Sequence, residues 1–257
     1  MREIIIIMAG GLGKRMESTT PKVLHELRGK PMLVRVIETA VSLKPYKILV
    51  IVGKYKDVIQ ATLAKWNLLG NVEFVVQLDA MGTGHAIQCC RSVLLEQAQV
   101  TSKVLILSGD VPLIKRDTLR DFFDNSSKAG ILAAEYDDPS GYGRVITLDN
   151  TFERIVEDKD CSPEERKCRT INAGIYVFET SSLCDYLPLL RNDNVQGEYY
   201  LTDIVGMYPS IDVFICHMPV EKHFELIGVN TKEQLRVLEL DLELELDLEL
   251  ELDLELN

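Results

Sequence analysis

The chain opens with residues whose types and spacing could bind a phosphate group. The apolar run at residues 4–7 leads into a glycine-rich loop at residues 9–13, and the cations Arg15 and Lys22 follow. Glycines let a backbone approach an anion closely and turn its N–H groups toward it. Arginine and lysine supply the positive charge that a polyphosphate needs. The spacing therefore indicates a nucleotide phosphate site at the end of a buried strand.

Two common phosphate-binding motifs do not fit this loop. A Walker loop needs a glycine five residues before its Gly-Lys pair, but Met8 stands there before Gly13 and Lys14. The dinucleotide fingerprint G-x-G-x-x-G is met at Gly11 and Gly13 and fails at Met16. A glycine-rich turn with solvated cations stays open as the alternative.

Strand and helix patterns alternate through the first half of the chain, and these elements must position the loop. That order builds an α/β, Rossmann-like, mostly parallel sheet with helices on both faces. Ligands of such sheets bind at the carboxyl ends of the strands, where the glycine loop and residues 108–112 both lie. We predict strands at residues 4–7, 50–52, 74–76 and 104–107, and helices near residues 31–43, 56–66 and 84–97.

The pattern changes after about residue 130 to shorter strands with tight turns. We expect residues 130–180 and 210–228 to form a smaller antiparallel lobe over the crevice. A helix is predicted at residues 231–239, with Thr231 as its cap, and it closes a domain of residues 1–239. Two lobes around a cleft suit an enzyme with two substrates.

Composition excludes several classes of protein. A chain of 257 residues can bury a large core, and no apolar run approaches the ~20 residues of a membrane span. The start shows no signal-peptide pattern, so we expect a cytoplasmic protein with no membrane partner. Six cysteines without a C-x-x-C pair are typical of free thiols in a reducing cytosol.

The net charge of −12 is mostly local. Residues 239–257 hold nine acids and no bases, and the remaining 31 acids nearly balance the 28 bases. Nothing in this balance favours nucleic acid as a partner.

Residues 240–257 repeat Leu-Asp-Leu-Glu-Leu-Glu, and this strict apolar and acidic alternation is strand-like. A lone strand cannot hide its leucines, and pairing identical copies sets like charges opposite one another. We therefore predict a tail that is disordered at neutral pH. The alternative is self-association of copies into a sheet when acid or a divalent cation neutralises the carboxylates.

Several further runs carry a family resemblance when they are taken in order. They are Met-Gly-Thr-Gly-His at 81–85, Gly-Asp at 109–110, Gly-Glu-Tyr-Tyr-Leu-Thr-Asp at 197–203 and Gly-Val-Asn at 228–230. With the opening loop, they resemble the uridylyltransferase domain of the N-acetylglucosamine-1-phosphate uridyltransferases, which are sugar nucleotidyltransferases. The similarity runs from about residue 3 to 238. It implies the nucleotide-diphospho-sugar transferase fold, with the antiparallel lobe binding the sugar.

The resemblance implies a magnesium-dependent transfer of UMP from UTP to N-acetylglucosamine 1-phosphate, giving UDP-N-acetylglucosamine and pyrophosphate. The sugar phosphate is itself the nucleophile, so alignment and charge neutralisation must dominate catalysis. The residues that match the family's site fall into four groups: catalytic Arg15 and Lys22; Mg²⁺ ligands Asp110 and Asn230; nucleotide-binding Met8, Ala9, Gly10, Gly11, Gln77, Gly82, Thr83 and Gly109; and sugar-binding Gly143, Glu157 and Asn172. Arg15 would hold the departing pyrophosphate, and Lys22 would bridge the reacting phosphates.

Some of these residues also have simpler interpretations. Asp110 could cap the helix that follows, Asn230 could be a turn residue, and Glu157 could belong to a solvated loop. His85 is interpreted as structural. The whole chain could also serve another sugar 1-phosphate or nucleotide, such as glucose 1-phosphate or dTTP, or be a non-catalytic assembly protein.

The chain departs from the family pattern in three places. Lys14 stands where many relatives carry threonine, and Ala80 stands where a second glutamine often touches the base. We expect looser uracil selection, or selection by other groups. The tail hexads at 240–257 lack the glycines and turn residues of the family's left-handed β-helix, so neither that helix nor acetyltransferase activity is predicted.

Overall fold

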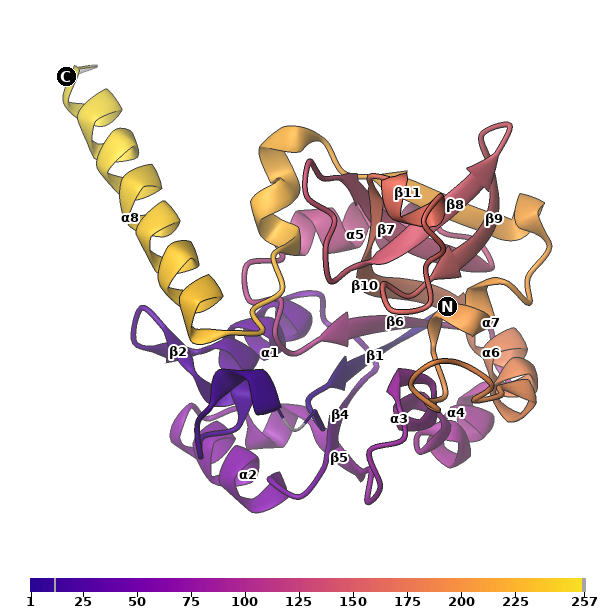
Figure 1. Ribbon diagram of the computed structural model, residues 1–257. Coiled ribbons are helices and arrows are strands. Elements are labelled where there is room, and N and C mark those ends of the chain that lie inside the picture. The colour runs from indigo at the N-terminus through magenta and orange to yellow at the C-terminus, as the bar shows by residue number, and fades with distance from the viewer. Residues whose placement is uncertain (12, 256–257) are drawn as a thin grey trace.

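The computed structural model describes residues 1–11 and 13–255, and a nine-stranded mixed sheet forms its centre (Figure 1). The four strands expected from the first half run parallel in the order β6-β1-β4-β5. Ile5 of β1 lies opposite Ile48 of β4 and Leu105 of β6, and all three are buried. These strands are β1 (Arg2–Met8), β4 (Lys47–Val52), β5 (Glu73–Val76) and β6 (Ser102–Ser108).

The helices cover both faces of the sheet because β1 is apolar on both sides. Ile5 and Ile7 pack in a core with α1, α2 and α5, whereas Ile4 and Ile6 pack in a second core with α3 and α4. The helix expected over 84–97 is divided into two. The bounds are α1 (Met32–Ser42), α2 (Lys56–Lys65), α3 (Thr83–Gln88), α4 (Arg91–Gln97) and α5 (Arg116–Asn125).

The antiparallel strands expected in the second half are present, but they join the central sheet. Strand β10 runs antiparallel to β6 on one side and to β7 on the other, and β11 adds parallel to β7. The β8–β9 hairpin branches from the start of β10. The remaining bounds are β2 (Glu26–Leu27), β3 (Lys30–Pro31), β7 (Ala129–Glu135), β8 (Gly143–Leu148), β9 (Thr151–Val156), β10 (Thr170–Glu179), β11 (Val213–His217), α6 (Thr180–Tyr186) and α7 (Thr202–Val205).

The helix predicted at 231–239 is confirmed, and the prediction for the tail is wrong. Thr231 Oγ1 accepts the backbone N–H of Gln234 at 3.1 Å, and Leu238 packs in a small buried cluster at the start of α8 (Lys232–Glu255). Residues 240–255 continue this helix, away from the sheet (Figure 1), instead of forming a disordered or strand-like tail. Leucine and glutamate both favour helix, and an anchored first turn removes the cost of nucleation. Residues 256–257 lie outside the described residues.

Of the described helices, none combines the length and the apolar composition that crossing a membrane requires. All six cysteines are free thiols, and burial raises the pKa of Cys90 to about 12.

Candidate active site

The residues expected to act on phosphates meet beyond the carboxyl ends of β1 and β6. The Lys22 ammonium forms an ion pair with Asp110 Oδ2 and donates a hydrogen bond to Asn230 Oδ1 at 3.0 Å. Arg15 donates to the same oxygen of Asn230 at 2.8 Å. Asn230 is 208 residues from Lys22 and 215 from Arg15, so only the fold brings these side chains together.

Asp110 is held from three directions. Its backbone carbonyl accepts the N–H of Val229 at 2.9 Å, which brings the chain before Asn230 to the end of β6. Ser108 donates its hydroxyl to Asp110 Oδ1 at 2.6 Å, while Lys22 occupies Oδ2. The carboxylate therefore bonds to neighbouring side chains, which is not the arrangement of a helix cap. The sequence interpretation missed Ser108, although it lies two residues before the aspartate at a strand end.

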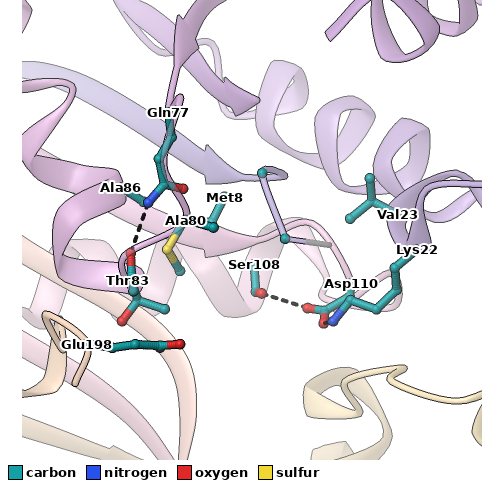
Figure 2. A pocket seen from close by; sticks show the side chains of 13 residues that line it. Met8, Lys22, Val23, Gln77, Ala80, Thr83, Ala86, Ser108, Asp110 and Glu198 are labelled. Atoms are coloured by element: carbon teal, nitrogen blue, oxygen red, sulfur yellow. Dashed lines mark hydrogen bonds and ion pairs between the residues drawn. The ribbon is translucent and has the colours of Figure 1, made fainter. Parts of the chain in front are cut away.

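A cavity of about 540 Å³ lies beside this cluster (Figure 2). Of the residues expected to bind the nucleotide, Ala9 and Gly109 do not line it. Ala9 is buried, and the Gly109 N–H donates to the Met8 carbonyl at 3.0 Å, which ties together the loops after β1 and β6. The lining residues are Met8, Gly10, Gly11, Lys22, Val23, Gln77, Ala80, Gly82, Thr83, Ala86, Ser108, Asp110 and Glu198.

Two of the motifs that carry the resemblance contact each other at this cavity. The Tyr199 N–H donates to the Met81 carbonyl at 2.8 Å, and the Gly84 N–H donates to the Tyr199 carbonyl at 2.7 Å. Leu201 N–H donates to Thr83 Oγ1 at 3.0 Å. The run at 197–203 thus fixes the turn that begins α3.

Replacement of Gly82 by alanine is expected to lower stability. Gly82 has a φ of +107°, and an added Cβ would lie 2.5 Å from the Tyr199 carbonyl oxygen. Strain of this kind costs about 1–3 kcal/mol, so the melting temperature should fall by several degrees. The matched control is Gly70→Ala, because nothing lies within 4 Å of a Cβ there. Equal melting temperatures for the two variants would contradict the expectation.

A second cavity of about 260 Å³ adjoins the first, and both are lined by Met8, Thr83, Ser108 and Asp110. Gly143, Glu157 and Asn172, expected to bind the sugar, all line this second cavity, as do Arg15 and Asn230. Tyr142, Gly174 and Gln234 also line it and were not expected.

Glu157 and Asn172 are held by neighbours from other elements. Thr202 at the start of α7 donates its hydroxyl to Glu157 Oε1 at 3.0 Å. Asn172 Nδ2 donates to the Tyr176 hydroxyl at 2.7 Å, across a bulge where the register of β10 against β7 shifts. Burial raises the pKa of the Glu157 carboxyl above its ordinary value, and the Thr202 hydrogen bond partly opposes that rise. Glu157 is therefore held at the cavity wall, and the interpretation of a solvated loop is wrong.

The raised pKa of Glu157 predicts a pH-dependent stability difference. Between the ordinary and the raised pKa, the folded chain binds more protons than the unfolded chain. The contribution of Glu157 to the free energy of unfolding therefore falls as pH rises through that window. Glu157→Gln should thus be more stable relative to the wild type at pH 7 than at pH 4. Melting temperatures across pH check this, with Glu153→Gln on β9 as the control. A difference that does not change with pH would contradict it.

Asp110 and Asn230 fit a hard divalent cation. Asp110 Oδ2 and Asn230 Oδ1 both face the Lys22 ammonium, so the oxygens already converge on a positive charge. Among the described residues, no group of three or more histidine, cysteine or acidic side chains could hold a metal. One carboxylate and one amide oxygen suit Mg²⁺, which keeps waters and shares phosphate oxygens.

The fold and the site together are those of a nucleotidyltransferase: a mixed α/β sheet carries a glycine loop, two adjoining cavities and the cluster of Arg15, Lys22, Asp110 and Asn230 beyond the carboxyl ends of β1 and β6. The chain belongs to the family of the MobA-like NTP transferase domain, whose model matches residues 5–191. The expected resemblance to the N-acetylglucosamine-1-phosphate uridyltransferases is confirmed for the uridylyltransferase domain.

Two curated relatives and one solved structure illustrate the match. The chain is 44% identical over 238 residues to "Bifunctional protein GlmU" of Burkholderia orbicola (strain MC0-3), covering 91% of this chain and 51% of that protein. It thus spans about half the length of that relative. It is 38% identical over 243 residues to a probable UDP-N-acetylglucosamine pyrophosphorylase of Acanthamoeba polyphaga mimivirus, covering 91% of this chain and 94% of the viral protein.

The fold also matches a solved structure from Bacillus anthracis, a candidate glucose-1-phosphate thymidylyltransferase in complex with sucrose. The TM-score is 0.70 at 21% identity, covering 92% of this chain and 94% of that chain. This likeness confirms the predicted fold class.

Proposed function

We propose that the chain catalyses magnesium-dependent transfer of UMP from UTP to N-acetylglucosamine 1-phosphate, giving UDP-N-acetylglucosamine and pyrophosphate. The observation that carries this proposal is the position of Asp110, which lies in the wall of both cavities and contacts Lys22. One cavity is lined by the glycine loop and the other by Glu157 and Asn172. The name of the viral relative, a probable UDP-N-acetylglucosamine pyrophosphorylase, is consistent with this chemistry.

The proposed reaction is one displacement at phosphorus. A phosphate oxygen of the sugar 1-phosphate bonds to the α-phosphorus of UTP, and the bond from that phosphorus to the bridging oxygen of pyrophosphate breaks. Mg²⁺ bound by Asp110 and Asn230 would neutralise phosphate charge. Lys22 would bind the phosphates between the cavities, and Arg15 would bind the departing pyrophosphate.

The two cavities would select the two substrates. Gln77 and the backbone of Gly82 would bind the uracil, and the glycine loop would approach the phosphates. Glu157 would accept hydrogen bonds from the sugar, since carboxylate oxygens accept hydroxyl and amide protons. On this proposal Glu157→Gln raises the KM for the sugar phosphate more than the KM for UTP.

A substrate panel tests the proposal. Pyrophosphate release is measured for UTP, dTTP, CTP and ATP against N-acetylglucosamine 1-phosphate and glucose 1-phosphate, with and without Mg²⁺. The UTP and amino-sugar pair should give the highest kcat/KM, and chelation should abolish it. A higher kcat/KM for dTTP with glucose 1-phosphate would assign the enzyme to another sugar nucleotide. Release from no pair would support an assembly protein.

We further propose that the chain acts in the cytosol. We also propose that it transfers no acetyl group, since residues 240–255 form helix α8 and not the family's left-handed β-helix. Assay of coenzyme A release from acetyl-CoA and glucosamine 1-phosphate should give none.

We also propose that copies self-associate through the tail at residues 240–257 when acid or a divalent cation neutralises its carboxylates. Sedimentation at about pH 4.5 and in millimolar calcium should give a larger species for the full chain than for a chain ending at residue 243. Equal sizes would overturn this proposal.

A further inference from the structure

The amide of Gln77 is held in one orientation in the nucleotide cavity. Its Nε2 lies 3.1 Å from the Gly82 carbonyl oxygen, to which it donates, and 3.1 Å from His85 Nδ1. Gln77 is 6% exposed and lines the cavity, which its side chain enters in Figure 2. A primary amide nitrogen carries two protons, so these two partners use both of them.

With Nε2 turned toward the Gly82 carbonyl, His85 Nδ1 is the acceptor in this pair, because an amide nitrogen has no lone pair to give. A reversed amide would place Gln77 Oε1 against the Gly82 carbonyl oxygen, which can only accept a hydrogen bond. The contacts thus favour one orientation, in which Oε1 is the atom left for a ligand.

The carbonyl end of Gln77 lies beside the glycine loop. A Cβ built on Gly10 would be 3.2 Å from Gln77 Oε1, so the absence of a side chain at Gly10 leaves this oxygen uncrowded. The cavity therefore presents an acceptor next to the loop expected to bind the phosphates.

We propose that His85 is a positioning residue for nucleobase selection, holding Gln77 so that its Oε1 accepts the ring N–H of a uracil-type base. This inference rests on the proposed function, which assigns the cavity to UTP. Uracil carries a proton at N3, whereas cytosine carries a lone pair there, so a fixed acceptor attracts the first and repels the second. His85 does not line the cavity, and it acts through Gln77. Gln77 and His85 would thus select the nucleobase in a cavity where Ala80 offers no polar group.

Equilibrium binding of UTP and CTP, each with Mg²⁺, tests the inference by calorimetry without turnover. In His85→Phe the ring keeps its volume but loses its acceptor, so Nε2 keeps only the contact with the Gly82 carbonyl and Oε1 is held less firmly against the base. The ratio of UTP to CTP affinity should fall about tenfold. His85→Asn can place Oδ1 near the position of Nδ1 and should restore most of the ratio. The control His217→Phe changes an exposed histidine at the end of β11 and should leave the ratio unchanged.

The ratio of UTP to CTP affinity distinguishes a positioning role of His85 from a structural one, because a merely structural role would weaken the binding of both nucleotides alike. An unchanged ratio in His85→Phe, or a wild type that binds both nucleotides equally, would overturn the inference. If His85→Phe does not fold, His85→Ala is compared with His85→Asn by the same ratio. A wild type that prefers UTP but makes no sugar nucleotide would refute the proposed function and leave the inference standing.

Discussion

Asp110→Ala is expected to abolish turnover while the chain stays folded. The carboxylate lies where the two cavities meet and contacts Lys22 and Ser108, so its removal takes away the charged ligand proposed for Mg²⁺. Loss of several kcal/mol of transition-state stabilisation corresponds to about 10³-fold or more in rate. Pyrophosphate release at saturating substrates measures the loss.

The magnesium dependence identifies the cause of that loss. Asn230→Ala keeps the charged ligand and removes the amide oxygen, so it should need more Mg²⁺ for half-maximal rate and have a lower kcat. Asp137→Ala is the control, because its side chain is 95% exposed and pairs with Arg169 at the surface. Full turnover in both Asp110→Ala and Asn230→Ala would refute the metal assignment. A melting temperature far below that of the control would mean that Asp110 acts through stability.

Arg15→Ala is expected to lower kcat by about 10²–10⁴. Its guanidinium reaches Asn230 Oδ1, beside Lys22, and the side chain is otherwise exposed at the cavity mouth. Because the Arg15 side chain is exposed, its removal should change the stability of the fold little. Charge on the departing pyrophosphate grows in the transition state, so a positioned cation lowers the barrier there.

The reverse reaction gives the sharper measurement for Arg15. If Arg15 binds pyrophosphate, Arg15→Ala should raise the KM for pyrophosphate, with little change in the KM for the sugar nucleotide. Arg15→Lys keeps the charge and loses the planar pair of donors, so it should recover only part of the rate. Arg116→Ala on α5, which removes an exposed guanidinium paired with Asp117, is the control. A rise only in the KM for the sugar nucleotide would place Arg15 elsewhere in the site.

Local patterns in the sequence predicted most of the fold. The buried strands and the helices between them have clear periodicity, and their order requires parallel pairing with crossovers. Thr231 likewise marked the start of α8. Residues 240–255 alternate like a strand, but they continue a helix whose start is anchored by Leu238, and their leucines and glutamates favour helix.

The sequence by itself determined the glycine loop, the parallel half of the sheet and the family, because these depend on residue types at short spacing. Only the tertiary structure decided which side chains meet. Lys22 reaches Asp110 and Asn230, which lie 88 and 208 residues away, because β1 and β6 are neighbours and the Val229 N–H bonds to the Asp110 carbonyl. It also decided that His85 contacts Gln77, since a chain turn at Gly82 brings the two together. Such contacts depend on how strands cross over and pack, and residue spacing along the chain does not specify those distances.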